Sequence, residues 1–435
     1  MRDRMRELLS ERRRRLVKVL SARWQRRAIF LLGGIVVGGA AMALALLADW
    51  AQLAFGRLVA EWRYASLVVT PLGFALSVFL TNRFFQNAQG SGIPQAIAAR
   101  QLTDQTVRGR LVSIRIAVGK VLLTLLGLVC GASVGREGPT VQVGASIMFA
   151  IGRMSPRRQP GLILAGAAAG VAAAFNTPLA GIVFGIEEMS RAFETRTSGL
   201  IIAAVIAAGL TSLALLGNYT YFGTSAAMLG NGADWLAVPL CGIAGGLAGG
   251  LFSRIVIMMA NGFRAPFGLA LKSHPILVAL ACGLGVALCG LASGDTIYGT
   301  GYAQVKAALE SGVPLPWSFG LLKFAATVLS SASGIPGGIF SPSLAVGAGL
   351  GVNVAYLFPH GALGAIILLG MVSYFAGVVQ APITAFVIVT EMTNNHAMVV
   401  PLMTSALIAY ATSRLVCPEG IYHALAKGFL RRSAG

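Results

Sequence analysis

This chain consists of long apolar segments separated by short polar ones. Apolar residues dominate from near residue 28 to near residue 416. A helix needs roughly 20 apolar residues to cross the hydrocarbon core of a bilayer. Several segments reach that length, whereas others, such as 138–152 and 381–392, do not. The pattern therefore predicts an all-α polytopic membrane protein in which some helices are tilted, broken or re-entrant.

Composition supports this class of protein and excludes a soluble globular one. Of the 435 residues, 56% are hydrophobic and only 11% are charged, and the mean hydropathy is +0.76. Such a chain has too few polar residues to cover its surface in water. The 55 glycines indicate close helix packing and interrupted helices, because small residues let backbones approach each other.

Much of the net charge of +19 lies in a basic run before residue 28. We interpret this run as a cytoplasmic, partly helical segment that lies on anionic lipid headgroups, as the positive-inside rule predicts. Nucleic-acid binding and a signal peptide are the alternatives. The run is long for a signal peptide, and further spans follow it. We therefore expect the lipid bilayer as a partner and no nucleic acid.

Cysteines and histidines form no pattern that predicts a metal or redox site. The five cysteines are scattered through apolar or span-end sequence without CxxC spacing, and the four histidines form no cluster. We interpret the cysteines as small core residues, and we expect no metal and no cofactor.

Three segments of the first half recur in the second half, in the same order. GSGIPQAIAA (90–99) matches GTGYAQVKAA (299–308), GREGPTVQVGA (135–145) matches GIFSPSLAVGA (338–348), and FNTPLAGIVFGIEEM (175–189) matches VQAPITAFVIVTEMT (379–393). The separations are 209, 203 and 204 residues. Repeated halves with interrupted helices are typical of transporters whose site lies between the repeats. The alignment alone leaves open whether the repeat is inverted or parallel.

The repeat divides the chain into five regions. We expect a basic N-terminal segment (1–27), a first transmembrane repeat (28–216), a linker (217–234), a second transmembrane repeat (235–416), and a C-terminal helix and tail (417–435).

A charged pair, Arg136 and Glu137, stands within apolar sequence. Ionisable residues at membrane depth are costly and therefore indicate an ion or substrate pathway. The surrounding GREGP, like GSGIP before it, places proline shortly after glycine, which is typical of a helix start. Helix starts present unpaired amides and a positive dipole end. Several of them meeting at one place would bind an anion and still let it leave.

Together these motifs resemble those of the CLC family of chloride channels and chloride/proton exchangers. GSGIP (90–94), GREGP (135–139) and GGIFSP (337–342) stand in the order of that family, and Tyr422 in GIYHALA occupies the place of its fourth signature. The resemblance covers about 28–429. It implies two inverted repeats, a separate pore within each subunit, and a homodimer. The implied dimer contact lies on 181–186 and 199–208 and on their counterparts 382–389 and 403–410.

The resemblance also implies an anion site. The hydroxyls of Ser91 and Tyr422 would face the central anion from two sides, and backbone amides at the helix starts would complete the site. The implied anion-binding residues are Ser91, Gly92, Ile93, Arg136, Gly138, Ile339, Phe340 and Tyr422. For Arg136 the implied ligand is the backbone amide, because the side chain of this arginine has a structural role in the family. An ion pair between Arg136 and Glu137 is awkward, since adjacent helical residues point apart. Polar capping is the alternative role for Ser91 and Tyr422.

Two glutamates are implied as the residues that transfer protons. Glu137 resembles the gating glutamate of the family, which occupies an anion site when ionised and leaves it when protonated. Glu188 stands where the family's exchangers carry an internal proton acceptor and its channels usually carry an apolar residue. Interfacial charge is the alternative for Glu187 and Glu188. Because Glu187 matches Glu391 in the repeat, we expect a structural or hydrogen-bonding role for Glu187 and Glu391.

We therefore expect a secondary active transporter that exchanges chloride for protons, and not an enzyme. A passive voltage- or pH-gated chloride channel is the main alternative, followed by a membrane-embedded enzyme that uses these carboxylates and by a protein that tethers nucleic acid. We expect the inner membrane of a bacterium, with both termini cytoplasmic. Ser91 is the residue type that the family associates with chloride. After Tyr422 the sequence leaves no room for the regulatory CBS modules of many relatives, so we expect no regulation of that kind.

Overall fold

The computed structural model describes residues 2–154, 158–190, 198–217, 220–230, 232–261, 273–359 and 361–434. Within these ranges the regular structure is helical, and the only β-type pairing is a pair of isolated bridges. The all-α class expected from the sequence is therefore what the described residues adopt.

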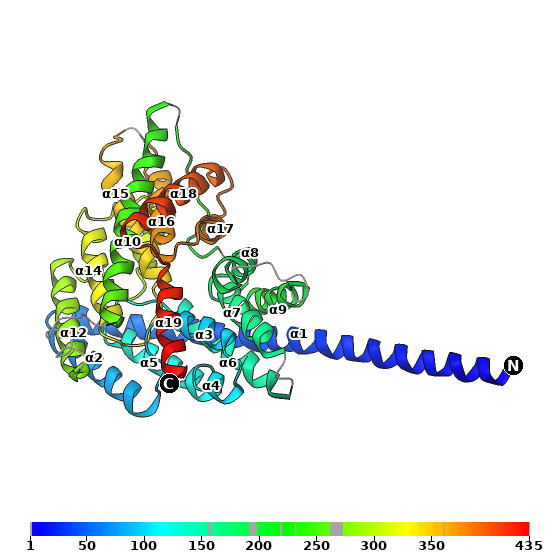
Figure 1. Ribbon diagram of the computed structural model, residues 1–435. Coiled ribbons are helices and arrows are strands. Elements are labelled where there is room, and N and C mark those ends of the chain that lie inside the picture. Colours follow the sequence, from blue (N-terminus) through cyan, green and yellow to red (C-terminus); the bar gives the residue numbers. More distant parts are fainter. Residues whose placement is uncertain are drawn as a thin grey trace.

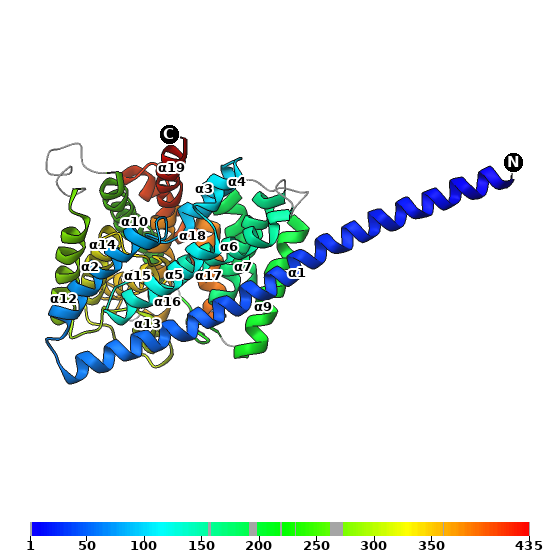
Figure 2. The same ribbon diagram turned by 90° about the horizontal axis from the view of Figure 1, so that it is seen from below.

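The described residues of the first half form nine α-helices, a short 3-10 turn (Gly152–Met154) and a π-helical turn. They are α1 (Arg2–Glu61), α2 (Ser66–Phe84), α3 (Ile93–Gln101), α4 (Gln105–Gly109), α5 (Ile114–Val129), α6 (Glu137–Ile151), α7 (Gln159–Phe175), α8 (Pro178–Phe184), the π-helical turn Gly185–Ser190, and α9 (Ser198–Leu216). α1 runs without interruption from the basic segment into the first apolar span, and Figures 1 and 2 show its N-terminal part extending away from the other helices.

The second half repeats this order of helices. It contains α10 (Ala237–Asn261), α12 (Pro275–Ala292), α13 (Tyr302–Glu310), α14 (Phe319–Ala332), α15 (Phe340–Ala355), α16 (Leu363–Val379), α17 (Pro382–Thr393) and α18 (Val399–Val416). A last helix, α19 (Ile421–Ala434), follows the repeat. In Figure 1 it lies in the middle of the molecule, beside helices of both halves.

Seven segments in the described part of the chain are long and apolar enough to cross a membrane. They are Arg27–Glu61, Ser66–Phe84, Gln105–Val129, Gly199–Leu216, Gly232–Asn261, Pro275–Ala292 and Val399–Val416. Five further apolar helices, among them α7, α15 and α16, are shorter than 18 residues. Long and short apolar helices thus occur together, as the sequence predicted.

Equivalent helices of the two halves make equivalent contacts. α6 packs on α7 as α15 packs on α16, and α1 packs on α9 as α10 packs on α18. α2 packs directly on its counterpart α12. The pair Gly135 and Gly338, which match in the sequence repeat, form an antiparallel bridge with each other. Because matched elements meet each other reciprocally, an approximate two-fold axis relates the halves and passes between these two glycines.

The segment between the repeats is packed into the protein. The amide of Phe222 donates to the carbonyl oxygen of Met392 at 2.9 Å, and that of Ser225 donates to Thr393 at 3.0 Å. Tyr221 and Phe222 are each 2% exposed. The linker expected at 217–234 therefore brings side chains into the interior as well as joining the halves.

Candidate functional site

Three helix starts meet near the two-fold axis. The loop before α6 pairs with the loop before α15 through Gly135 and Gly338, whose amides and carbonyl oxygens form two hydrogen bonds of 2.7 Å. The loop before α3 joins them, because the amide of Gly90 donates to Ile335 at 3.2 Å and that of Gly337 donates to Gly90 at 3.0 Å. The motifs GSGIP, GREGP and GGIFSP are thus brought together by backbone hydrogen bonds.

Glycine is required where these loops touch. A Cβ atom on Gly138 would lie 2.8 Å from the carbonyl oxygen of Ser91 and 3.1 Å from the Cα atom of Gly338. A Cβ atom on Gly338 would lie 2.9 Å from the backbone nitrogen of Gly138. The backbones are therefore so close that a side chain larger than a hydrogen atom does not fit at Gly138 or Gly338 without a shift.

Several backbone amides at the helix starts donate no hydrogen bond within the described part of the protein. Among the described residues, the amides of Gly138, Ile339 and Phe340 donate no backbone or side-chain hydrogen bond to the protein. The amide of Ile93 makes a long contact of 3.4 Å to the hydroxyl of Ser91. Free amides at converging helix N-termini are the donors that bind anions in proteins. The local sequence produces them, since proline stands in the first turn of α3, α6 and α15.

Glu137 is the first residue of α6 and is fully buried. Its Oε1 atom accepts a hydrogen bond of 2.5 Å from the hydroxyl of Ser341 and a longer one of 3.4 Å from the phenol of Tyr221. Its Oε2 atom has no hydrogen-bond partner among the described residues. That oxygen lies against Gly135, where a Cβ atom would be 2.3 Å away. A carboxylate at a helix N-terminus is favoured by the dipole, and here it stands among amides that would equally bind an anion.

Arg136 points away from this carboxylate. Its guanidinium lies 2.7 Å from a carboxylate oxygen of Asp49 and donates at 2.6 Å to the carbonyl oxygen of Ala45, both on α1. The side chain therefore ties the start of α6 to α1. Only its backbone faces the loop contacts described above.

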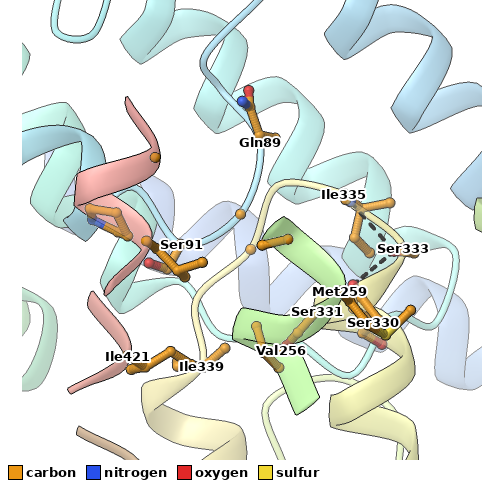
Figure 3. Close-up of a pocket in the computed structure, with 18 of the residues that line it drawn as sticks. Gln89, Ser91, Val256, Met259, Ser330, Ser331, Ser333, Ile335, Ile339 and Ile421 are labelled. Carbon is orange, nitrogen blue, oxygen red and sulfur yellow. Dashed lines mark hydrogen bonds between the residues drawn. The ribbon is translucent and has the colours of Figure 1, made fainter. Parts of the chain in front are cut away.

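Ser91, Ile339 and Tyr422 line one cavity of about 660 Å³. Figure 3 shows Ser91, Ile339 and Ile421 entering it from three different elements. The described lining includes the amides of Gln89 and Gln95, three serines at the end of α14, and Arg432, but no acidic residue. The phenolic oxygen of Tyr422 is buried and has no partner among the described residues. A cavity with hydroxyl donors, one cation and no lining carboxylate suits an anion.

An aromatic cluster links Tyr422, which lines this cavity, to Tyr221, which donates to Glu137. The ring of Phe340 packs on those of Phe175, Phe375 and Tyr422 at centroid distances of 6.0, 4.8 and 6.0 Å. Phe175 in turn packs on Tyr221 at 5.4 Å.

Glu188 lies in the π-helical turn Gly185–Ser190 and is 3% exposed. Its Oε1 atom is 3.0 Å from the Nδ1 atom of His423, the neighbour of Tyr422 on α19. One helix therefore presents a phenol to the cavity lined by Ser91 and an imidazole to the second buried glutamate.

Glu187, the residue before Glu188, caps a helix. Its carboxylate accepts from the amides of Ile383 and Thr384 at the start of α17. Its repeat counterpart Glu391 accepts from the amides of Leu179 and Ala180 at the start of α8. This reciprocal capping is the structural role that the sequence match suggested for the pair.

Sequence reasoning did not find three residues that contact the two glutamates. Tyr221 lies in the segment expected as a linker, Ser341 lies within GGIFSP, and His423 is one of four histidines that form no cluster in the sequence. The position of His423 directly after Tyr422 in GIYHALA was the one available signal. The other two contacts join residues 84 and 204 positions apart, and no local pattern announces them.

These features define a polytopic membrane transport protein built from two related halves. Residues 72–414 match the family described as "Voltage gated chloride channel", and the chain belongs to that family. The match contains both buried glutamates and all three helix starts. Membership makes the chain a transport protein and not an enzyme, as expected.

Relatives and solved structures resemble the chain over most of its length. The H(+)/Cl(−) exchange transporter ClcA of Yersinia pseudotuberculosis (serotype IB, strain PB1/+) is 32% identical and covers 95% of this chain and 90% of its own. The protein of the same name from Citrobacter koseri is 32% identical and covers 89% of this chain and 85% of its own.

Two solved structures are similar in fold. A slow cyanobacterial Cl−/H+ antiporter shares 25% identity at a TM-score of 0.77, and the alignment covers 94% of this chain and 98% of that one. A CLC-type fluoride/proton antiporter shares 22% identity at a TM-score of 0.76, covering 92% and 97%. The expected fold of two inverted repeats with tilted and broken helices, and the family recognised from the motifs, are confirmed.

Proposed function

We infer that the chain is a secondary active transporter that exchanges chloride for protons. Its relatives are named H(+)/Cl(−) exchange transporters, and a fold neighbour at 25% identity is a Cl−/H+ antiporter. The observation that carries the inference is the position of Glu137, whose carboxylate lies at a helix N-terminus beside the unused amides of Gly138 and Ile339.

In the proposed cycle the anion site consists of Ser91, Tyr422 and the amides at the three helix starts. Ionised Glu137 competes with chloride for those amides, because both are anions that accept hydrogen bonds. Protonation removes the charge, so the side chain no longer gains from the dipole and chloride takes its place. Proton binding at Glu137 and chloride binding at the amides are therefore alternatives.

Glu188 provides the inner end of the proton route. It is a second buried carboxylate, and it lies outside the lining of the anion cavity. A proton that reaches Glu137 from one side can therefore leave through Glu188 without following the chloride path. A channel needs no such second acceptor, which is why this residue favours exchange.

We further propose that the protein is a homodimer in a bacterial inner membrane with cytoplasmic termini. Apolar side chains of α9, α17 and α18 are exposed on the segments that the family resemblance assigns to the dimer contact, among them Ile206, Ile383 and Leu407. The basic run before the first span supports a cytoplasmic N-terminus.

The test is proton pumping by a chloride gradient in liposomes that contain the purified protein. An outward chloride gradient is expected to drive protons inward against their own gradient. Glu188→Gln is expected to keep chloride flux and to lose proton movement, and Glu137→Gln is expected to lose coupling while chloride still passes. Chloride flux in the wild type with no proton movement would leave a passive chloride channel as the function.

A further inference from the structure

The immediate surroundings of Glu188 contain an ionisable group that the exchange cycle described above does not use. His423 places its Nδ1 atom 3.0 Å from Oε1 of Glu188. An ionised carboxylate only accepts hydrogen bonds, so Nδ1 carries the proton in that state. The Nε2 atom makes no hydrogen bond to any described residue.

His423 lines a second cavity, of about 870 Å³, which Glu187 lines as well. Glu188 does not line this cavity. The side chain of His423 is 14% exposed and that of Glu188 is 5% exposed. The histidine therefore stands between the buried carboxylate and the cavity.

The cavity is polar where it meets α19. Glu419, Lys427 and Arg414 line it and are exposed to solvent. Glu419 and Lys427 form an ion pair of 2.6 Å at this rim. These three residues lie outside the segments proposed for the dimer contact, whereas Ile186, Ile383 and Leu407 on another part of the lining belong to those segments.

The contact between His423 and Glu188 is held from several elements. Arg100 on α3 donates to the carbonyl oxygen of Met189 and to the hydroxyl of Ser190, both at 3.0 Å, and so fixes the turn that carries Glu188. α3 also packs on α19. The titratable groups on the surrounding elements are Arg100, Glu187, Arg254, Tyr374, Tyr410, Arg414, Glu419, Tyr422 and Lys427.

We propose that His423 is the residue through which protons pass between the cavity beside α19 and Glu188. This inference rests on the proposed exchange function and adds a residue to its proton route. A proton from water adds to Nε2, and the Nδ1 proton moves to Oε1 of Glu188. One proton enters and one reaches the carboxylate, which leaves neutral imidazole with its proton on Nε2. When the transfer runs in reverse, Glu188 gives its proton to Nδ1. Loss of the Nε2 proton to water then restores the first tautomer.

The experiment compares His423→Gln and His423→Ala with the wild type by simultaneous chloride and proton recording in liposomes. The glutamine keeps an N–H donor for Glu188 but does not carry a proton at neutral pH. Both variants are expected to keep chloride flux and to lower proton flux by about ten-fold or more, a modest share of what a positioned acid–base group contributes. Imidazole in the buffer is expected to restore proton flux in His423→Ala, which leaves room for it, and not in His423→Gln. His396→Gln changes an exposed histidine outside this site and is the matched control.

Each other outcome has a definite meaning. An unchanged ratio of protons to chloride in both variants, or full proton flux in His423→Gln, overturns the proposal and leaves the exchange function standing. Loss of chloride flux in both variants also overturns it, because proton entry is not needed for anion movement. Absence of proton movement in the wild type overturns the exchange function, and this inference with it.

Discussion

Gly135 and Gly338 hydrogen-bond to each other in both directions, each amide donating to the other's carbonyl oxygen at 2.7 Å. They are counterparts in the sequence repeat, and the contact joins the starts of α6 and α15. The same backbone geometry therefore serves two purposes. It fixes one half of the molecule against the other, and it orients the unused amides of both helices toward one region.

The first prediction concerns the close approach of these loops. A Cβ atom on Gly338 would lie 2.9 Å from the backbone nitrogen of Gly138 and 3.1 Å from the carbonyl oxygen of Gly135. Overpacking of this kind costs about 1–3 kcal/mol, and here the neighbouring atoms are backbone. Gly338→Ala is expected to lower chloride flux in liposomes about ten-fold or more, because each 1.4 kcal/mol is a factor of about ten.

The control is Gly56→Ala in α1, where a Cβ atom meets nothing within 4 Å. It is expected to transport chloride at the wild-type rate. Equal rates for both alanine variants would show that the loop contact does not shape the anion site.

The second prediction distinguishes the two hydroxyl groups that donate to the carboxylate of Glu137. Ser341 donates at 2.5 Å and Tyr221 at 3.4 Å. A hydrogen bond to a charged group contributes about 1.5–3 kcal/mol, so Ser341→Ala is expected to release the carboxylate and raise chloride flux about ten-fold at alkaline pH. Tyr221→Phe removes a weaker contact and is expected to have a smaller effect. Flux recordings from pH 5 to 8 measure both, and a larger effect of Tyr221→Phe would contradict the assignment.

The third prediction follows from the reciprocal caps. Glu187 caps α17 and Glu391 caps α8 through equivalent amides. A lost N-terminal cap costs about 1 kcal/mol, so Glu187→Gln and Glu391→Gln are expected to lower the thermal unfolding midpoint in detergent by similar amounts. Glu61→Gln, at an exposed helix end, is the control and is expected to leave the midpoint unchanged. A drop for one cap variant alone would argue against equivalent roles.

The fourth prediction tests the dimer face. Leu407 on α18 is 50% exposed within the segment assigned to the contact, and Leu321 on α14 is 70% exposed elsewhere. Lysine at either position introduces a charge among apolar surroundings. Leu407→Lys is expected to shift the protein from dimer to monomer in light-scattering measurements, whereas Leu321→Lys is expected to remain dimeric. Dimers of equal stability in both variants would place the contact on another face.

Glu188 is predicted only through the family resemblance. The repeat, the three helix starts and Glu137 can be predicted from the residues themselves. Each of these is encoded locally, by glycine and proline within a few residues or by carboxylates in apolar sequence. The partners of the glutamates are not encoded in this way. Tyr221 reaches Glu137 because the segment between the halves folds inward, and His423 reaches Glu188 across 235 positions of sequence.

For the same reason, the burial of part of the linker cannot be predicted from the sequence. Its polar and glycine-rich composition is typical of a connection on the surface. Tyr221 and Phe222 nevertheless pack into an aromatic cluster with Tyr302, at centroid distances of 4.8 and 5.7 Å from its ring. Burial of two aromatic side chains depends on rings contributed by other elements, which only the folded arrangement reveals.

The most direct test of the exchange function is the reversal potential of the purified protein in a bilayer with opposed chloride and pH gradients. Exchange couples the two ions, so the reversal potential is expected to shift when the pH gradient alone is changed, and Glu188→Gln is expected to abolish that shift. A reversal potential set by chloride alone in the wild type would contradict the account and identify a passive chloride channel.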